Sequence, residues 1–499
     1  MQNIFLSLLF WLFFLPLSAF SSEFTDNELG NRIAISFFDD NTQLLSQEDI
    51  NKFHSLGITI AEISDFNRAG HLSFDQYNIF LRFELRYPTV NRLITKREQI
   101  VQEILSTYRD ANRTYPGNIA AISLFSFPNE NNTQFFAASS ALADTLSRHI
   151  STPLYYHSSK PSAETLPDHF DFIAGYISAT QDYDFISDSQ ISYFKPSENK
   201  RESYQVLEKL LNESVLQTSS IVIIPAAWLN DRLDQNSGFD RQLQLHMQGN
   251  KIQLPLPDSE PDQPSANWSV ILLAIIWISF LIHYRNQPGY SAILTRYFTG
   301  HKFFVADVKE HRLRSTAPGF IILFQHSLLS GLAFYIMADT FFSNLGMLAL
   351  TKYFPGLIIM NHEYLSFFLL GATLAILSHL ISVFWIYILN KKASHFSQVL
   401  NLYSWPLHIN LIIVTFLVYM HQIGAEQVWF LATILAFIVV WFMAFNLAAT
   451  DCASFLEKYQ ALNLLFTVAL HLLIVIGLTY WLFNLPSVIE PVQLALYLS

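Results

Sequence analysis

Two patterns of apolar residues divide the chain at about residue 267. Before residue 250, short β-branched runs alternate with amphipathic stretches, which is typical of strands and helices in turn. From Trp268 onward the apolar runs are long enough to cross a hydrocarbon core of about 30 Å. The sequence therefore predicts a water-facing α/β domain followed by an all-α membrane domain.

The first part contains eight candidate strands with helices between several of them. The strands are expected at 32–38, 58–63, 79–87, 118–125, 153–156, 170–177, 191–194 and 220–224, and the helices at 47–54, 96–112, 134–150, 201–216 and 232–247. Eight strands in roughly 225 residues predict a small (β/α)₈ barrel. An open α/β sheet is the alternative, because no clear helix separates the sixth strand from the seventh.

Six apolar segments are expected to span a membrane, near 268–284, 318–337, 367–389, 406–420, 428–449 and 462–483. If the Trp268 end is outside the cytoplasm, the inner segments hold nine basic residues and the outer ones only Lys352, as the positive-inside rule requires. The C-terminus is then also outside. Residues 340–364 are expected to lie in the interface or to re-enter the membrane, and a spanning helix there is the alternative.

The remaining segments complete the predicted organisation. Residues 1–21 resemble a signal peptide, although no Lys or Arg precedes the apolar run, so an uncleaved anchor is the alternative. Residues 22–250 form the extracytoplasmic domain, 251–267 a proline-rich acidic linker and 268–499 the membrane domain. We expect an integral protein of a bacterial inner membrane, with its N-terminal domain and C-terminus extracytoplasmic.

Charge and cysteine content exclude some ligands and covalent links. Residues 22–267 carry 32 acidic and 19 basic residues, a net charge of −13, which argues against nucleic acid as a ligand. The single cysteine, Cys452, allows no intrachain disulfide. No spacing of residues indicates a metal site, and no cofactor is expected.

Polar residues follow several of the predicted strands. In a (β/α)₈ barrel the carboxyl ends of the strands surround one opening, where active sites lie. The residues expected there are Asp39, Asp40, Asp65, Arg86, Asn129, Glu130 and His157. An arginine among carboxylates suits the hydroxyl groups of a sugar.

The segment IAAISLFSFPNE, residues 119–130, resembles the fourth strand of retaining glycoside hydrolases built on this barrel. The opening, residues 33–63, resembles their first βαβ unit. The resemblance implies that Glu130 is the general acid/base, with a carboxylate nucleophile at the end of strand seven about 5 Å away. Strand seven, ISYFKP, has no Asp or Glu at that place. The alternative is that Asn129 and Glu130 belong to an exposed turn.

Strand three alternates charged and apolar residues. Period two places Arg82, Glu84 and Arg86 on one face, and this face must point either into a polar lumen or outward as a salt-bridged edge. A lumenal face would favour binding of an anion or a sugar.

Histidines occur in the predicted spans at positions 326, 379, 408 and 471, with His421 near an interface. Because no intramembrane Asp, Glu, Lys or Arg accompanies His326, His379, His408 and His471, hydrogen bonding between helices is expected, and a proton or metal pathway is the alternative. The region after residue 285, with SQVLNLYSWP at 397–406, resembles Yip-type membrane domains, which implies a membrane-organising scaffold.

Three functions remain open. The first is a membrane-anchored, extracytoplasmic carbohydrate-binding protein with a degenerate hydrolase-like barrel. The second is an active glycosidase that uses Glu130. The third is a polytopic scaffold or transporter-like protein with a sensing ectodomain. The expected partners are the lipid bilayer and an oligosaccharide or cell-envelope glycan.

Overall fold

The structure is a computed structural model of the 499-residue chain. It describes residues 33–37, 45–64, 72–83, 89–125, 132–158, 169–177, 191–197, 200–215, 220–236, 238–257, 267–354, 356, 363–390, 394–456 and 458–498. The chain divides into two compact units, Met1–Pro261 and Asp262–Ser499, and the boundary falls within the acidic proline-rich segment. The expected signal peptide lies outside the described residues.

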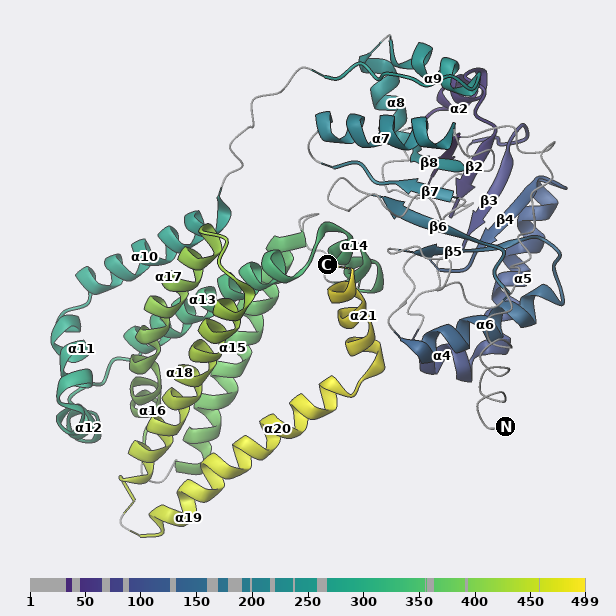
Figure 1. Cartoon of the computed structure of the whole chain (residues 1–499). Helices are drawn as coiled ribbons and strands as arrows, with labels where there is room; N and C mark the ends of the chain where they lie inside the picture. The colour runs from purple at the N-terminus through teal and green to yellow at the C-terminus, as the bar shows by residue number, and fades with distance from the viewer. Residues whose placement is uncertain are drawn as a thin grey trace, which may run out of the picture. The chain divides into compact units, whose positions relative to one another are not determined.

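The first unit is a closed barrel of eight parallel strands in sequence order, and β1 pairs with both β2 and β8 (Figure 1). Closure rules out the open sheet. The strands overlap all eight predicted runs: β1 Ile33–Ser36, β2 Ile60–Ile63, β3 Asn78–Arg82, β4 Ile119–Ser123, β5 Leu154–Ser158, β6 Phe172–Ile177, β7 Ile191–Phe194 and β8 Ile221–Pro225.

Both faces of the strands are buried, and the outward face is mostly apolar. Outward-facing residues such as Ile35, Ile79 and Ile224 share one apolar cluster with the surrounding helices. Inward-facing residues fill the lumen, as in other barrels of this size.

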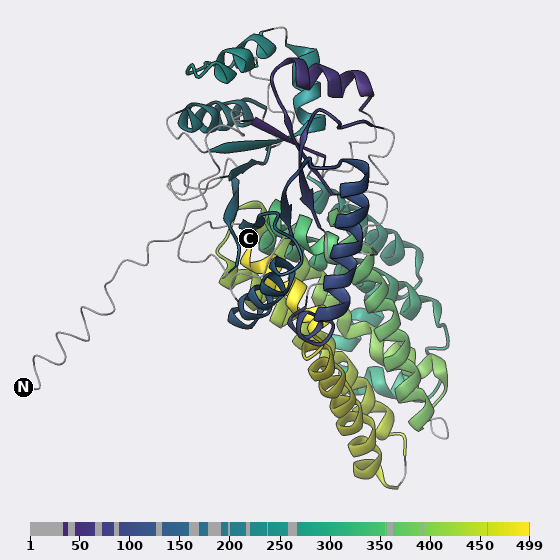
Figure 2. The same ribbon diagram turned by 90° about the vertical axis from the view of Figure 1, so that its right-hand side faces the viewer.

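The helices of this unit lie around the outside of the strands (Figure 2). They are α2 Gln47–Ser55, α4 Val90–Thr95, α5 Arg97–Thr114, α6 Thr133–Ser147, α7 Lys200–Ser214, α8 Ala226–Gln235 and α9 Phe239–Met247. The prediction missed α4. The predicted helix 232–247 is in fact the end of α8 followed by α9. Between the two helices the Gly238 amide donates to Asn236 Oδ1 at 3.1 Å.

In its described residues the second unit, here called the membrane unit, is all-α and contains six helices that are each long and apolar enough to cross a membrane. They span Trp268–Asn286, Ala317–Phe341, Tyr364–Asn390, Phe396–Gln422, Gln427–Ala453 and Gln460–Phe483. The elements are α10 Trp268–Asn286, α11 Tyr290–Thr299, α12 His301–Lys309, α13 Ala317–Phe341, α14 Asn344–Tyr353, α15 Glu363–Asn390, α16 Phe396–Ser404, η5 Trp405–His408, α17 Ile409–Gln422, α18 Gln427–Ala453, α19 Gln460–Leu464, η6 Leu465–Ala469, α20 Leu470–Phe483 and α21 Pro486–Tyr497.

The fourth span begins ten residues before the predicted start at Pro406. Proline is tolerated in the first turn of a helix because it lacks an amide hydrogen. Here the chain passes through Pro406 as a short 3₁₀ turn, η5, which joins α16 to α17 without a break in the span.

Contacts between helix ends fall into two groups. At one end of the bundle Asn267 bonds to Gln422, and His421 Nε2 lies 2.7 Å from Asp339. At the other end His301 Nε2 lies 3.0 Å from Asp451. The start of the first span therefore lies at the same end of the bundle as the ends of the second and fourth spans, which is the arrangement of successive antiparallel spans.

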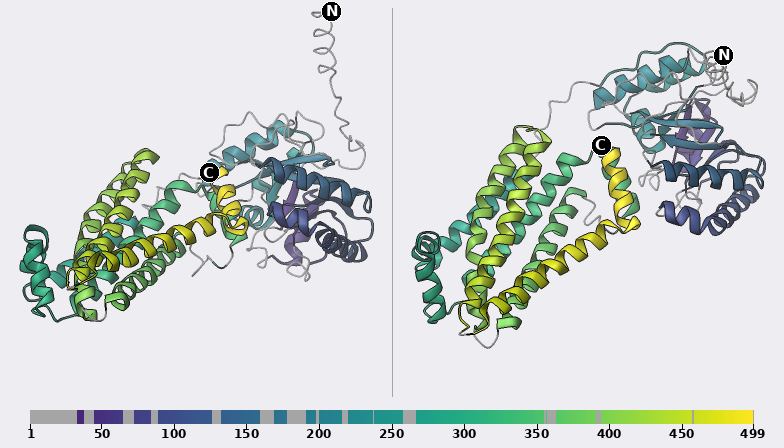
Figure 3. Two further views of the ribbon diagram at one scale, coloured as in Figure 1. Left: turned by 90° about the horizontal axis from the view of Figure 1, so that it is seen from below. Right: turned by 60° about the horizontal axis from the view of Figure 1, so that its bottom comes forward.

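Residues 340–364 contain α14, whose ten residues extend only about 15 Å and are too short to span. It packs with the C-terminal helix α21, and Ser343 Oγ donates to the Leu498 carbonyl at 2.8 Å. Figure 3 shows α20, in yellow, diverging from the other spans toward this pair. Residues 355 and 357–362 of the expected re-entrant segment lie outside the described part of the chain.

Candidate functional site

The lumen of the barrel is built in two layers. The lower layer is aromatic, and the rings of Tyr155 and Phe172 stack at 5.4 Å with Phe80 beside them at 5.7 Å from Tyr155. Above it, toward the carboxyl ends of the strands, lies a layer of polar side chains. This polar layer consists of Ser36, Glu62, Arg82, Ser123, His157, Tyr176 and Tyr193, together with the hydroxyl of Tyr155.

Glu62 is the centre of the polar layer. Ser36 Oγ donates to its Oε2 at 2.6 Å, and the Tyr155 hydroxyl donates to its Oε1 at 2.7 Å. Arg82 Nη1 lies 3.3 Å from Oε2, and both side chains of this ion pair are 0% exposed. The carboxylate is therefore fully enclosed, and its partners come from three other strands, β1, β3 and β5.

Arg82 connects Glu62 to the tyrosines of β6 and β7. Its Nη2 donates to the Tyr176 hydroxyl, and its guanidinium carbon lies 5.8 Å and 5.5 Å from the ring centres of Tyr176 and Tyr193. The Tyr193 hydroxyl donates to Ser36 Oγ at 3.1 Å, which closes the network. Tyr176 and Tyr193 each retain 5% exposure, whereas Glu62 and Arg82 have none.

His157 borders the same carboxylate. Its Nε2 lies 3.3 Å from Glu62 Oε1, and its Nδ1 lies 2.8 Å from Ser123 Oγ. A serine, a histidine and a carboxylate in contact can activate the serine as a nucleophile where a substrate reaches it. Ser123 is 0% exposed, so the described arrangement offers its oxygen to no substrate.

The electrostatics of the polar layer hold Glu62 ionised and His157 neutral. Burial alone would raise the pKa of Glu62, but the Arg82 charge and the hydrogen bonds from His157 and Ser36 outweigh it and bring the pKa to about 2. Burial and the Arg82 charge lower the pKa of His157 to about 4. A general acid at neutral pH needs a raised pKa, and Glu62 has the opposite.

Of the residues predicted for the barrel mouth, the structure describes only His157, and it lies in the polar layer. Asp39, Asp40, Asp65, Arg86, Asn129 and Glu130 lie outside the described residues. Strand β7 carries no carboxylate.

Glu62, Tyr176 and Tyr193 were not among the predicted site residues. A single glutamate inside the apolar run IAEI was the available signal, because an unpaired carboxylate is rarely buried. The lumenal alternative for strand three holds for Arg82, while Glu84 and Arg86 lie outside the described residues.

The membrane unit has a second polar cluster in its core. His326 Nδ1 lies 2.9 Å from His379 Nε2, and His379 Nδ1 lies 2.8 Å from the Tyr403 hydroxyl, which also accepts from Trp441 Nε1 at 2.9 Å. Asn410 Nδ2 lies 2.7 Å from His326 Nε2. These side chains come from five helices, so the hydrogen bonding between helices that the sequence predicted is present.

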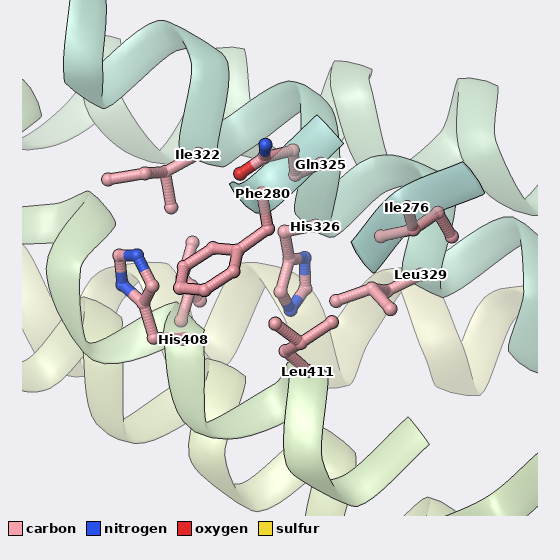
Figure 4. A pocket seen from close by; sticks show the side chains of 9 residues that line it. Ile276, Phe280, Ile322, Gln325, His326, Leu329, His408 and Leu411 are labelled. Atoms are coloured by element: carbon pink, nitrogen blue, oxygen red, sulfur yellow. The ribbon is translucent and has the colours of Figure 1, made fainter. Parts of the chain in front are cut away.

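A small cavity adjoins this cluster, and His326 and His408 both line it (Figure 4). Its volume is about 20 Å³, enough for roughly one water, and Ile276, Leu329 and Leu411 make much of its lining. Both nitrogens of His408 have partners, the Trp405 carbonyl at 2.7 Å and the Tyr290 hydroxyl. The cavity therefore resembles a packing void more than a polar passage.

His471 lies apart from this cavity and stacks on Phe445 at 4.0 Å. Three of the four predicted histidines are thus linked by contacts or a shared cavity, and the fourth is not. Among the described residues no group of three or more His, Cys, Asp or Glu side chains is placed to hold a metal ion.

Comparisons with known proteins add no relative. The chain matches no protein-family model, no curated protein and no solved structure.

Proposed function

We propose that this chain is a membrane-anchored protein whose barrel binds a carbohydrate at the carboxyl ends of its strands without cleaving it. We further propose that the barrel is extracytoplasmic, in a bacterial inner membrane, and that its ligand is an oligosaccharide or a cell-envelope glycan. The buried ion pair of Glu62 and Arg82, surrounded by tyrosines, is the observation that carries the proposal.

The ion pair is costly for a barrel that needs only to fold. Replacing a buried ion pair with apolar residues of similar volume is often neutral or stabilising by about 1–4 kcal/mol. Its position at the carboxyl ends of the strands, where barrels of this type bind ligands, supports a role in a site. The network would fix the tyrosine rings that a sugar contacts.

The protonation state of the network favours binding over hydrolysis. Glycoside hydrolysis needs a protonated acid and a second carboxylate. Glu62 is the carboxylate of the described lumen, and its low pKa leaves it without a proton to donate. Catalysis by Glu130, and with it the resemblance to glycoside hydrolases, remains the alternative.

A role centred on the membrane unit is the second candidate. The shared cavity of His326 and His408 favours it. The small size of the cavity and the complete bonding of His408 weigh against it, because a proton pathway needs groups that can exchange partners.

The test uses the full chain in detergent on an oligosaccharide array. Tyr193→Phe removes one hydroxyl at the mouth, and binding should weaken about fivefold to tenfold, as for the loss of one hydrogen bond. Tyr77→Phe is the matched control, because the Tyr77 hydroxyl is also buried and donates to the Ile50 carbonyl at 2.7 Å outside the lumen.

Three outcomes decide between the candidates. Binding that Tyr193→Phe weakens and Tyr77→Phe leaves unchanged supports the proposal. Release of reducing sugar that Glu130→Gln abolishes supports the glycosidase instead. Binding of no oligosaccharide contradicts both carbohydrate functions.

A further inference from the structure

A groove on the membrane unit lies outside both polar clusters. It has a volume of about 470 Å³ and is formed by α11 and the start of α12, between the first and second spans. Its lining includes Ser291, Thr295, Arg296, Thr299, Gly300 and Phe303. The groove is open to the surroundings and is mostly polar along α11.

Helix α11 has two distinct faces. Tyr290 and Tyr297 are 1% and 4% exposed and pack in the bundle with Phe304 and Trp405. The opposite face carries the hydroxyl groups and the guanidinium that line the groove, at the spacing of one helical side. The helix therefore lies against the bundle and turns a polar face outward.

Two phenylalanines stand beside this polar face. Phe298 and Phe303 are 47% and 73% exposed. An exposed phenylalanine in water forgoes much of the roughly 1.5–3 kcal/mol that burial gives. Exposed aromatic rings next to basic and hydroxyl side chains are typical of helices that lie in the membrane interface.

The segment also carries an excess of positive charge. Residues 285–314 contain six basic and two acidic residues. Both acidic side chains are paired, Asp307 with Arg296 and Arg312, and Glu310 with Arg312 at 2.6 Å. The net charge of +4 (six minus two) would attract an anion.

We propose that the groove between α11 and α12 binds the phosphate headgroup of an anionic phospholipid, with Phe298 and Phe303 entering the acyl region. Arg296 is 52% exposed in its side chain, so its guanidinium has N–H groups beyond the one bonded to Asp307. The Thr295 hydroxyl is on the same face and can donate to a phosphate oxygen, whereas the Thr299 hydroxyl donates to the Thr295 carbonyl at 2.8 Å.

The amino terminus of α12 is a further feature of the groove that favours an anion. Among the described residues no side chain caps the first turn of α12, and this turn follows Gly300 at the end of the groove lining. Helix amino termini favour anions. A lipid is the preferred occupant over a soluble phosphate because the groove adjoins exposed aromatic rings and two spans.

The test measures lipid binding to the delipidated full chain in detergent. Native mass spectrometry should show phosphatidylglycerol binding more tightly than phosphatidylcholine. Arg296→Gln should weaken phosphatidylglycerol binding about fivefold, the effect of one basic residue at a lipid surface. Arg314→Gln is the matched control, because it removes the same charge from an exposed residue outside the groove lining.

A second variant guards against misfolding, since Arg296 also pairs with Asp307. Thr295→Val keeps the side-chain shape, leaves the ion pair intact and should also weaken phosphatidylglycerol binding. Equal binding of the two lipids, or an equal effect of Arg314→Gln, would overturn the proposal. Displacement of the lipid by millimolar glycerol phosphate would show a soluble-phosphate site instead.

Discussion

Replacing Glu62 with glutamine should destabilise the barrel much more than removing the acid of a surface ion pair. The change keeps the shape of the Glu62 side chain. It leaves Arg82 charged, and the Arg82 side chain is 0% exposed. Breaking a buried pair in this way costs about 3–5 kcal/mol, because the remaining charge has lost its counterion.

The control pair is Lys52 and Asp234, whose atoms are closer at 2.6 Å but whose side chains are 36% and 60% exposed. Solvent screens such a pair, so Asp234→Asn should cost about 1 kcal/mol or less. Burial rather than distance should therefore decide the outcome.

Amide hydrogen exchange on the full chain measures the effect in β2 and β3 directly. A decrease of 3 kcal/mol in the free energy of unfolding corresponds to amide exchange about 10²-fold faster. In the control variant Asp234→Asn the exchange rate should change by less than about tenfold. Exchange that is no faster in Glu62→Gln than in Asp234→Asn would refute the account of the ion pair. Glu62→Leu with Arg82→Met should recover part of the loss, because no charge is then buried alone.

Three further predictions concern acid, packing and topology. As the pH falls from 6.5 to 4, the free energy of unfolding of the barrel should decrease by about 3 kcal/mol. The reason is that His157 in the unfolded chain takes up a proton, whereas in the folded barrel it does so only near its lowered pKa of about 4. His157→Asn should flatten this pH dependence in hydrogen-exchange measurements. Gly331→Ala should destabilise the bundle, because a new Cβ would lie 2.5 Å from the Phe368 carbonyl. Gly477→Ala meets nothing within 4 Å and should be neutral. Faster thiol labelling of the buried Cys452 reports the destabilisation. A reporter active only in the cytoplasm should work when fused after Lys302 and fail after Gln263, and the reverse result would invert the topology.

The fold was predictable because its signals are local. Buried strands read as short apolar runs, so segments such as Ile221–Pro225 and Ile191–Phe194 stand out without knowledge of their partners. Spans stand out for the same reason. Boundaries were less accurate, as at the fourth span, which begins ten residues before its predicted start at Pro406.

The site was less predictable because its contacts are distant in sequence. Glu62 meets Arg82 twenty positions later, and Arg82 meets Tyr176 after a further 94. Only closure of the barrel brings these strands to one lumen. The prediction instead chose polar residues after the strands, and of these the structure describes His157 alone.

The central claim, that the barrel mouth binds an intact glycan, is tested most directly by hydrogen exchange of the full chain with its tightest oligosaccharide. Bound sugar should slow exchange in peptides that contain the last residues of β5, β6 and β7, leave α9 unchanged and be recovered uncleaved. Protection confined to the membrane unit, or recovery of cleaved sugar, would contradict the account.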